Sequence, residues 1–175
     1  RVLVTGGAGF IGSHLVDRII REEPVSISVV DNFFLGKEEN LQEAANARPD
    51  LEIFRLDASD LAAMRDLVVK QNIEVVFNLA VIPLPTSLEY PVWTVNSNIG
   101  IALTFCELAR TGCIETLIHC SSSEAYGSAE TIPMNEDHPA NPKTPYAASK
   151  LAGDELVLSY VRTFNIDSVV VRPFN

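Results

Sequence analysis

Near its beginning the chain reads Thr5-Gly-Gly-Ala-Gly-Phe-Ile-Gly12, directly after the apolar residues Val2-Leu-Val4. An apolar strand, a glycine-rich turn and an amphipathic helix are predicted in this order, because Ile11, Leu15 and Ile19 recur with the helical period. Glycines permit a tight turn and let the backbone approach a phosphate with no Cβ in the way. The first N–H groups of the following helix then point at the anion. A glycine triplet alone is weak evidence, so its surroundings decide its meaning.

The same alternation of strand and helix patterns continues along the chain. Strands are predicted at residues 2–5, 26–30, 52–56, 75–80, 116–121 and 168–172, and helices at residues 11–22, 38–47, 61–71, 96–110 and 146–163. Apolar residues are consecutive in the strand runs, which is typical of parallel strands covered on both faces. The sequence therefore predicts an α/β fold, a Rossmann-like doubly wound parallel sheet, over residues 1–175. Ligands are expected beyond the carboxyl ends of its strands.

Composition excludes several classes of function. The net charge of −10 argues against a nucleic-acid-binding surface, which needs basic residues. No apolar run approaches the roughly 20 residues of a membrane span, and no signal peptide is recognised, so a cytoplasmic protein is expected. Cys106, Cys113 and Cys120 lack the spacing of metal ligands. We expect reduced thiols and no metal site.

The acid that follows the second predicted strand indicates the cofactor. Asp31 lies 19 positions beyond Gly12, where a carboxylate can accept hydrogen bonds from both hydroxyls of an adenine ribose. It would repel a 2′-phosphate, so NAD is favoured over NADP. Asp57 follows the third strand and could bind the adenine amino group. Equally, Asp57 or Ser59 could cap the helix that begins near Leu61.

The catalytic candidates lie in the second half of the chain. Tyr146 and Lys150 are four residues apart on a predicted helix, so they share a face. An ammonium beside a phenol favours the phenolate and is expected to lower the pKa of Tyr146. Ser122, at the end of the fifth strand, could then hold a substrate oxygen while Tyr146 removes its proton. His14, His119 and His138 are expected to have structural roles.

These stretches together resemble the extended short-chain dehydrogenase/reductase superfamily, in its NAD-dependent nucleotide-sugar epimerase/dehydratase branch. The resemblance rests on Thr5–Gly12, Asp31-Asn32, Asn78-Leu-Ala80, Ser121-Ser-Ser-Glu-Ala-Tyr-Gly127, Tyr146-x-x-x-Lys150 and Arg172-Pro-Phe-Asn175. It implies a catalytic triad of Ser122, Tyr146 and Lys150, a bound NAD and a nucleotide-sugar substrate. The smaller substrate domain of the family is expected to lie beyond residue 175. The resemblance also implies a homodimer, formed through helices 96–110 and 146–163. Leu103, Leu108, Leu156 and Val161 would be buried there, unless they face the sheet.

The resemblance assigns the remaining site residues. Cofactor contacts are expected from Gly6, Gly9, Phe10, Ile11, Gly12, Asp31, Asn32, Asp57, Ala58, Leu79, Ala80, Tyr146, Lys150 and Pro173. Substrate contacts are expected from Ser87, Ser122, Ser123, Glu124 and Asn175.

Glu124 bears on the reaction. In this branch a 4-keto sugar can be re-reduced, dehydrated across C5 and C6, or decarboxylated, and dehydration needs a base for the C5 proton. Glu124 resembles the dehydratase glutamate, although Ser123 stands where glucose-type dehydratases place Asp. The Ser-Glu pair is more similar to GDP-mannose-type dehydratases, related amino-sugar dehydratases or UDP-glucuronate decarboxylases. We therefore favour a 4,6-dehydratase and keep a 4-epimerase and a UDP-glucuronate decarboxylase as alternatives. A protein that senses NAD without turnover is the alternative from another class.

Overall fold

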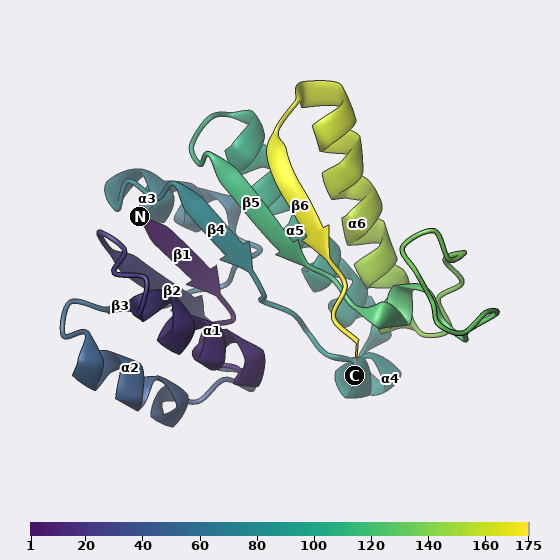
Figure 1. The fold of residues 1–175 in the computed structure, drawn as a ribbon, viewed down its shortest axis with the longest axis horizontal. Helices are drawn as coiled ribbons and strands as arrows, with labels where there is room; N and C mark the ends of the chain where they lie inside the picture. Colours follow the sequence, from purple (N-terminus) through teal and green to yellow (C-terminus); the bar gives the residue numbers. More distant parts are fainter. Residues whose placement is uncertain (175) are drawn as a thin grey trace.

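Six parallel strands form one sheet in the order β3-β2-β1-β4-β5-β6 (Figure 1). The computed structural model describes residues 1–174. The strands are β1 (Val2–Thr5), β2 (Ile27–Asp31), β3 (Glu52–Arg55), β4 (Val75–Asn78), β5 (Thr116–Cys120) and β6 (Asp167–Val171). The chain reverses its direction across the sheet between β1 and β4, which makes their carboxyl ends the expected place for a ligand. The predicted doubly wound parallel sheet is confirmed.

Helices cover both faces of this sheet. They are α1 (Phe10–Ile20), α2 (Gln42–Ala47), α3 (Leu61–Lys70), α4 (Leu84–Glu89), α5 (Pro91–Arg110) and α6 (Pro145–Phe164), with 3₁₀ turns η1 (Glu38–Leu41) and η2 (Ser123–Ala125). Residues of α1 and α2 pack against one face, and residues of α3, α5 and α6 pack against the other. This division follows from right-handed crossovers that run in opposite directions from β1.

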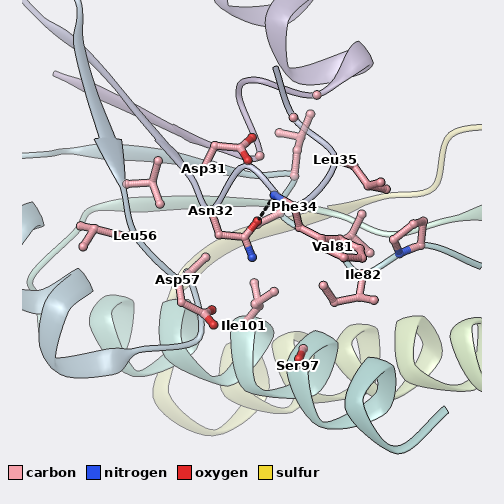
Figure 2. A pocket seen from close by; sticks show the side chains of 18 of the residues that line it. Asp31, Asn32, Phe34, Leu35, Leu56, Asp57, Val81, Ile82, Ser97 and Ile101 are labelled. Atoms are coloured by element: carbon pink, nitrogen blue, oxygen red, sulfur yellow. Dashed lines mark hydrogen bonds between the residues drawn. The ribbon is translucent and has the colours of Figure 1, made fainter. Parts of the chain in front are cut away.

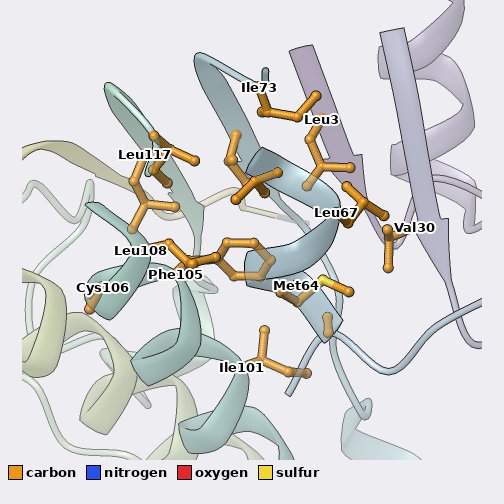
Figure 3. Packing of buried hydrophobic residues seen from close by; sticks show 14 of the residues in the cluster. Leu3, Val30, Met64, Leu67, Ile73, Ile101, Phe105, Cys106, Leu108 and Leu117 are labelled. Atoms are coloured by element: carbon orange, nitrogen blue, oxygen red, sulfur yellow. The ribbon is translucent and has the colours of Figure 1, made fainter. Parts of the chain in front are cut away.

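The two hydrophobic clusters share the central strands because neighbouring side chains point to opposite faces. Leu3 packs with the α3 and α5 residues, whereas Val4 packs with α1. Phe105 of α5 is fully buried at the centre of the first cluster, close to Met64 and Leu117 (Figure 3). Both faces of the central strands are therefore covered, as their consecutive apolar residues predict.

The edge strands differ from that prediction. Ile53 in β3 and Val169 in β6 are 40% and 50% exposed. An edge strand has one neighbour instead of two, and these two side chains lie outside both hydrophobic clusters. The prediction from consecutive apolar residues thus overestimates how deeply the side chains of the edge strands β3 and β6 are buried.

The start of one helix differs from the sequence prediction, and one short helix was not predicted. α5 begins at Pro91, five residues before the predicted start at Asn96, because proline fits the first helical turn. α4 was not predicted, since Pro83 and Pro85 suggest a loop, yet Pro85 lies in the first turn of that short helix. Within residues 1–174, no helix combines the length and apolar character that crossing a bilayer requires.

Candidate active site

The glycine turn after β1 packs tightly against the end of β4. Gly6 has a φ of +67°, and a Cβ there would lie 2.8 Å from the backbone nitrogen of Ala80. A Cβ on Gly12 would lie 2.1 Å from the carbonyl oxygen of Gly6. The N-cap of α1, Gly9, makes no side-chain capping bond, so the first N–H groups of the helix can meet an anion. Only glycine fits this geometry, which suits a pyrophosphate cradle.

Asp31 is fixed beside the turn by backbone donors. Its Oδ2 accepts a 2.9 Å hydrogen bond from the N–H of Ala8, and its Oδ1 accepts one of 2.8 Å from Phe33. The backbone of Gly36 packs directly against this carboxylate, and a Cβ there would clash with it at 2.7 Å from Asp31 Oδ1. Each carboxylate oxygen keeps a second lone pair free for a ribose hydroxyl. The Asp31 side chain therefore fits its predicted role.

A cavity of about 480 Å³ lies in front of these groups. Figure 2 shows Asp31 and Asn32 across from Ser97 and Ile101 of α5, with Asp57 at the side. Nine predicted cofactor residues line the cavity, namely Gly6, Gly9, Phe10, Asp31, Asn32, Asp57, Ala58, Leu79 and Ala80. Its extent and its glycine and carboxylate lining fit a dinucleotide. Ile11, Gly12, Tyr146, Lys150 and Pro173 were also predicted as cofactor contacts but do not line it.

The sequence prediction missed the wall that α5 contributes. Trp93, Ser97 and Ile101 line the cavity at intervals of four residues, which is one face of a helix. The ring of Trp93 meets that of Phe34 edge-on at 5.0 Å between centroids, across the cavity mouth. The spacing of the three residues could have revealed this wall if the helix had been predicted from Pro91.

The open question about Asp57 is partly answered by the structure. The N-cap of α3 is Asp60, whose carboxylate accepts hydrogen bonds from the N–H groups of Ala62 and Ala63. Capping by Asp57 or Ser59 is therefore wrong. Asp57 instead accepts two 2.8 Å hydrogen bonds from Ser59 and lines the cavity. Its predicted contact with adenine remains a prediction.

α6 carries Tyr146 and Lys150 toward the end of β5. Thr144 caps the helix by accepting a hydrogen bond from Ala147, with Pro145 in the first turn. Lys150 is 5% exposed, and its ammonium donates a 2.6 Å hydrogen bond to the carbonyl oxygen of Cys120. Burial lowers the pKa of Lys150 from its usual value. The structure thus places a nearly buried cation at the carboxyl end of β5.

A buried amide fixes α5 relative to α6. Asn98 accepts a hydrogen bond from Ile82 N–H, and its amide nitrogen donates to Ile82 O and to Ser149 Oγ. Ser149 immediately precedes Lys150. One side chain therefore holds together the segment between β4 and α4, α5, and the helix that bears the catalytic candidates.

Ser122 and Glu124 lie close to the Tyr146 phenol. Ser122 caps the short η2 turn by accepting a 3.2 Å hydrogen bond from Glu124 N–H. Burial raises the pKa of Tyr146, the Ser122 hydroxyl opposes that rise, and the Cys120 thiol and the Glu124 carboxylate add to it. This direction is opposite to the predicted one, because burial of the phenol is the largest cause of the shift. The three predicted side chains are nevertheless brought together.

The remaining predicted substrate residues differ in their placement. Ser87 is 1% exposed, and its hydroxyl donates a 2.7 Å hydrogen bond to Leu84 O inside α4, so its predicted substrate contact is not supported. Ser123 N–H donates to Pro173 O at 3.1 Å, which ties η2 to the segment after β6. Asn175 lies outside the described residues.

His119, His138 and Cys106 make no contact with Tyr146 or Ser122 among the hydrogen bonds of the described residues. His119 is buried between β4 and α6, and His138 Nε2 accepts a hydrogen bond from Glu130 N–H in the loop before α6. Cys106 is buried, and burial raises the pKa of its thiol to about 12. Among residues 1–174, no three side chains of His, Cys, Asp or Glu are grouped as a metal site would require.

Comparison with known proteins identifies the family. The model of the NAD-dependent epimerase/dehydratase family matches residues 2–175. The chain belongs to this family. Family members depend on NAD, and the cradle, the Asp31 carboxylate and the cavity described above fit that cofactor.

Relatives with different reactions are similar to the chain. A putative UDP-glucose 4-epimerase of Methanocaldococcus jannaschii is 35% identical over 99% of this chain and 55% of its own length. A dTDP-glucose 4,6-dehydratase of Actinoplanes sp. is 36% identical over 100% of this chain and 56% of its own. UDP-glucuronic acid decarboxylase 6 of Arabidopsis thaliana is 33% identical over 100% of this chain and 50% of its own. The chain thus spans about half the length of these relatives.

A solved structure agrees with the fold. The dTDP-glucose 4,6-dehydratase of Streptomyces venezuelae, with NAD and TYD bound, superposes with a TM-score of 0.90 at 28% identity. The match covers 98% of this chain and 55% of that one.

Proposed function

We propose that the protein carrying this chain oxidises C4 of a nucleotide-linked hexose, removes water across C5 and C6, and then returns the hydride to C6 while C5 takes up a proton, which would regenerate bound NAD. The observation that carries this proposal is the grouping of Ser122, Glu124 and Tyr146 at the end of β5, beside the buried Lys150. Relatives that act on nucleotide sugars support the substrate class.

Each side chain has a distinct task in this proposal. Ser122 holds the C4 oxygen by hydrogen bonding, and Tyr146 takes the hydroxyl proton. NAD, when bound, supplies the acceptor for the hydride from C4. Lys150 provides a positive charge near the end of β5.

Glu124 distinguishes dehydration from epimerisation. A ketone at C4 acidifies the C5 proton, yet a base must still remove it. Glu124 lies two residues beyond Ser122, and its charge acts on Tyr146, so a carboxylate is available at the reacting end of the site. An epimerase needs only to turn the keto sugar and return the hydride to its other face. Glu124 therefore favours the dehydratase.

The test uses the full-length protein in D₂O with a panel of nucleotide hexoses. We expect a 4-keto-6-deoxy product that carries deuterium at C5. Glu124→Gln should lower dehydration by roughly 10²–10⁴, the usual effect of losing an acid-base group, while bound NAD is still partly reduced. Glu130→Gln, an exposed loop carboxylate, is the matched control and should leave turnover unchanged.

Two other products would replace this proposal. A product that keeps its 6-hydroxyl and differs only at C4 would establish a 4-epimerase, which the Methanocaldococcus jannaschii relative favours. Release of CO₂ from a nucleotide-linked uronic acid would establish a decarboxylase, as in the Arabidopsis thaliana relative.

A further inference from the structure

Three buried polar atoms lie together between β5 and α6 without a hydrogen-bond partner among the residues described. They are His119 Nε2, Ser121 Oγ and Asp154 Oδ1. His119 lies in β5, and Ser121 directly follows the last residue of that strand, two positions further on, so the two side chains point to the same face. Asp154 belongs to α6. His119 is 2% exposed and Asp154 is 0% exposed, so bulk solvent reaches neither. Unpaired polar groups are costly inside a protein, so this grouping needs a physical explanation.

The protonation of His119 follows from its other neighbours. Thr5 Oγ1 accepts a hydrogen bond from Ala80 N–H and donates one of 2.8 Å to Asn78 Oδ1. The amide nitrogen of Asn78 therefore faces His119 Nδ1, at 3.1 Å, and donates to it. Burial lowers the pKa of His119 to about 3, so the ring is neutral and its proton lies on Nε2. The unpartnered Nε2 is thus a hydrogen-bond donor.

The separation of the polar atoms is compatible with a bridging water molecule. His119 Nε2 and Asp154 Oδ1 are 3.9 Å apart, too far for a direct hydrogen bond. Ser121 lies beside the same carboxylate without a hydrogen bond of normal length. Gly153 keeps the place open, because a Cβ there would lie 3.2 Å from His119 Nε2. A water molecule would accept from His119, donate to Asp154 and bond to Ser121, which gives the three partners typical of buried water.

Asp154 is also the carboxylate that faces two cations, the buried Lys150 and the partly buried Arg172. Its Oδ2 accepts a 2.8 Å hydrogen bond from Arg172 Nε, and Arg172 Nη1 donates to Tyr126 OH at 2.8 Å. Lys150 precedes Asp154 by one turn on the same face of α6. Burial raises the pKa of Asp154, while Ser121, Arg172 and Lys150 oppose the rise. The carboxylate thus connects the end of β6, the interior of β5 and the helix that carries Lys150.

We propose that Asp154 is a positioning residue for Lys150. Its carboxylate binds Arg172 directly and binds His119 and Ser121 through one internal water molecule. These contacts fix α6 against β5 and β6, so that the Lys150 ammonium meets Cys120 O at the end of β5. Only the kinetic consequence rests on the proposed function; the water site does not.

A high-resolution crystal structure of the full-length wild-type protein tests the water site without any variant. We expect an ordered water molecule about 3 Å from each of His119 Nε2, Ser121 Oγ and Asp154 Oδ1. A direct hydrogen bond between His119 and Asp154, or an empty space between the three atoms, would overturn the proposal.

Kinetics test the positioning role. Asp154→Asn removes the charge but keeps the shape, and we expect kcat on the nucleotide sugar to fall about 10- to 100-fold, as small displacements of catalytic groups do. KM should stay nearly unchanged, because Asp154 touches no substrate. Glu155→Gln, an exposed neighbour on α6, is the control and should match the wild type. A folded Asp154→Asn protein with wild-type kcat would refute the role. A protein that contains the water but turns over no nucleotide sugar would instead contradict the proposed function.

Discussion

Asp31 illustrates how one residue can set cofactor choice. Its carboxylate is held by two backbone N–H donors and points at the cavity. Removing it takes away the acceptor for the ribose hydroxyls and the charge that repels a 2′-phosphate.

We therefore expect Asp31→Ala to weaken NAD binding about 10- to 100-fold, the range for a hydrogen bond to a charged group, and NADP binding much less. Asn32→Ala also removes a loop hydrogen bond, the 2.9 Å bond from Phe34 N–H, but no charge. It should affect both cofactors alike. Equal losses for NAD and NADP in Asp31→Ala, measured by titration, would refute the assignment.

The places of site residues were predictable from the sequence where a motif fixes the local backbone. Properties that depend on burial, such as the pKa of a side chain, were less predictable. The glycine turn and Asp31 lie at the cavity as predicted, because the end of a strand and the start of a helix place them. The pKa of Tyr146 was predicted in the wrong direction. The four-residue spacing brings Lys150 to the same face, but it reveals neither the burial of the phenol nor the bond from Lys150 to Cys120 O.

The phenol of Tyr160 joins α6 to α5, because it donates a hydrogen bond to Glu107, which also forms an ion pair with Arg110 within α5. Glu107 of α5 accepts 2.7 Å and 2.6 Å hydrogen bonds from Arg110 and Tyr160. These bonds lower the pKa of Glu107 to about 2, Arg110 contributing most. A carboxyl group with a depressed folded-state pKa stabilises the protein above its unfolded pKa, and the stabilisation is lost as pH falls through the folded value.

Glu107→Gln should therefore lower the stability at about pH 7 by on the order of 1 kcal/mol, the usual contribution of such hydrogen bonds. The difference from the wild type should shrink as the pH falls from the ordinary pKa of 4.5 toward about 2. Thermal unfolding at a series of pH values measures this. Glu115→Gln, an exposed position, is the control. A difference that does not depend on pH would contradict the assignment.

Element types were more predictable than element ends. All six strands were predicted to within two residues at either end. The helix predicted at residues 38–47 is divided into η1 and α2. α4 was not predicted because prolines are common both in loops and at the start of a helix, so Pro83 and Pro85 did not indicate which of the two was present. The wall of the cavity on α5 was missed for the same reason, since the predicted helix started after Trp93.

At the scale of the whole molecule, α5 and α6 lie side by side and offer apolar surface (Figure 1). Leu103 is 41% exposed, and Leu156 and Val161 are partly buried. Leu108 is 0% exposed and belongs to the core, so for this residue the sheet-facing alternative is correct. Leu103, Leu156 and Val161 therefore remain candidates for the predicted dimer interface, and Leu108 does not.

We expect the full-length protein to be a dimer at micromolar concentration and Leu103→Glu to shift it toward the monomer, because the charge would be buried in the interface. Val69→Glu places the same charge on an exposed site of α3 and should leave the dimer intact. Sedimentation velocity distinguishes these states. A wild-type monomer, or a Leu103→Glu dimer, would show that these helices do not form the interface.

Tyr146 is the proposed base in the oxidation of a nucleotide sugar. The most direct test of this role compares turnover of Tyr146→Phe with that of the wild type in the full-length protein, together with NAD affinity. The phenol lies in the group formed with Ser122 and Glu124 but does not line the cavity. We therefore predict NAD affinity close to that of the wild type and turnover reduced by roughly 10²–10⁴. Wild-type turnover in Tyr146→Phe would contradict the account.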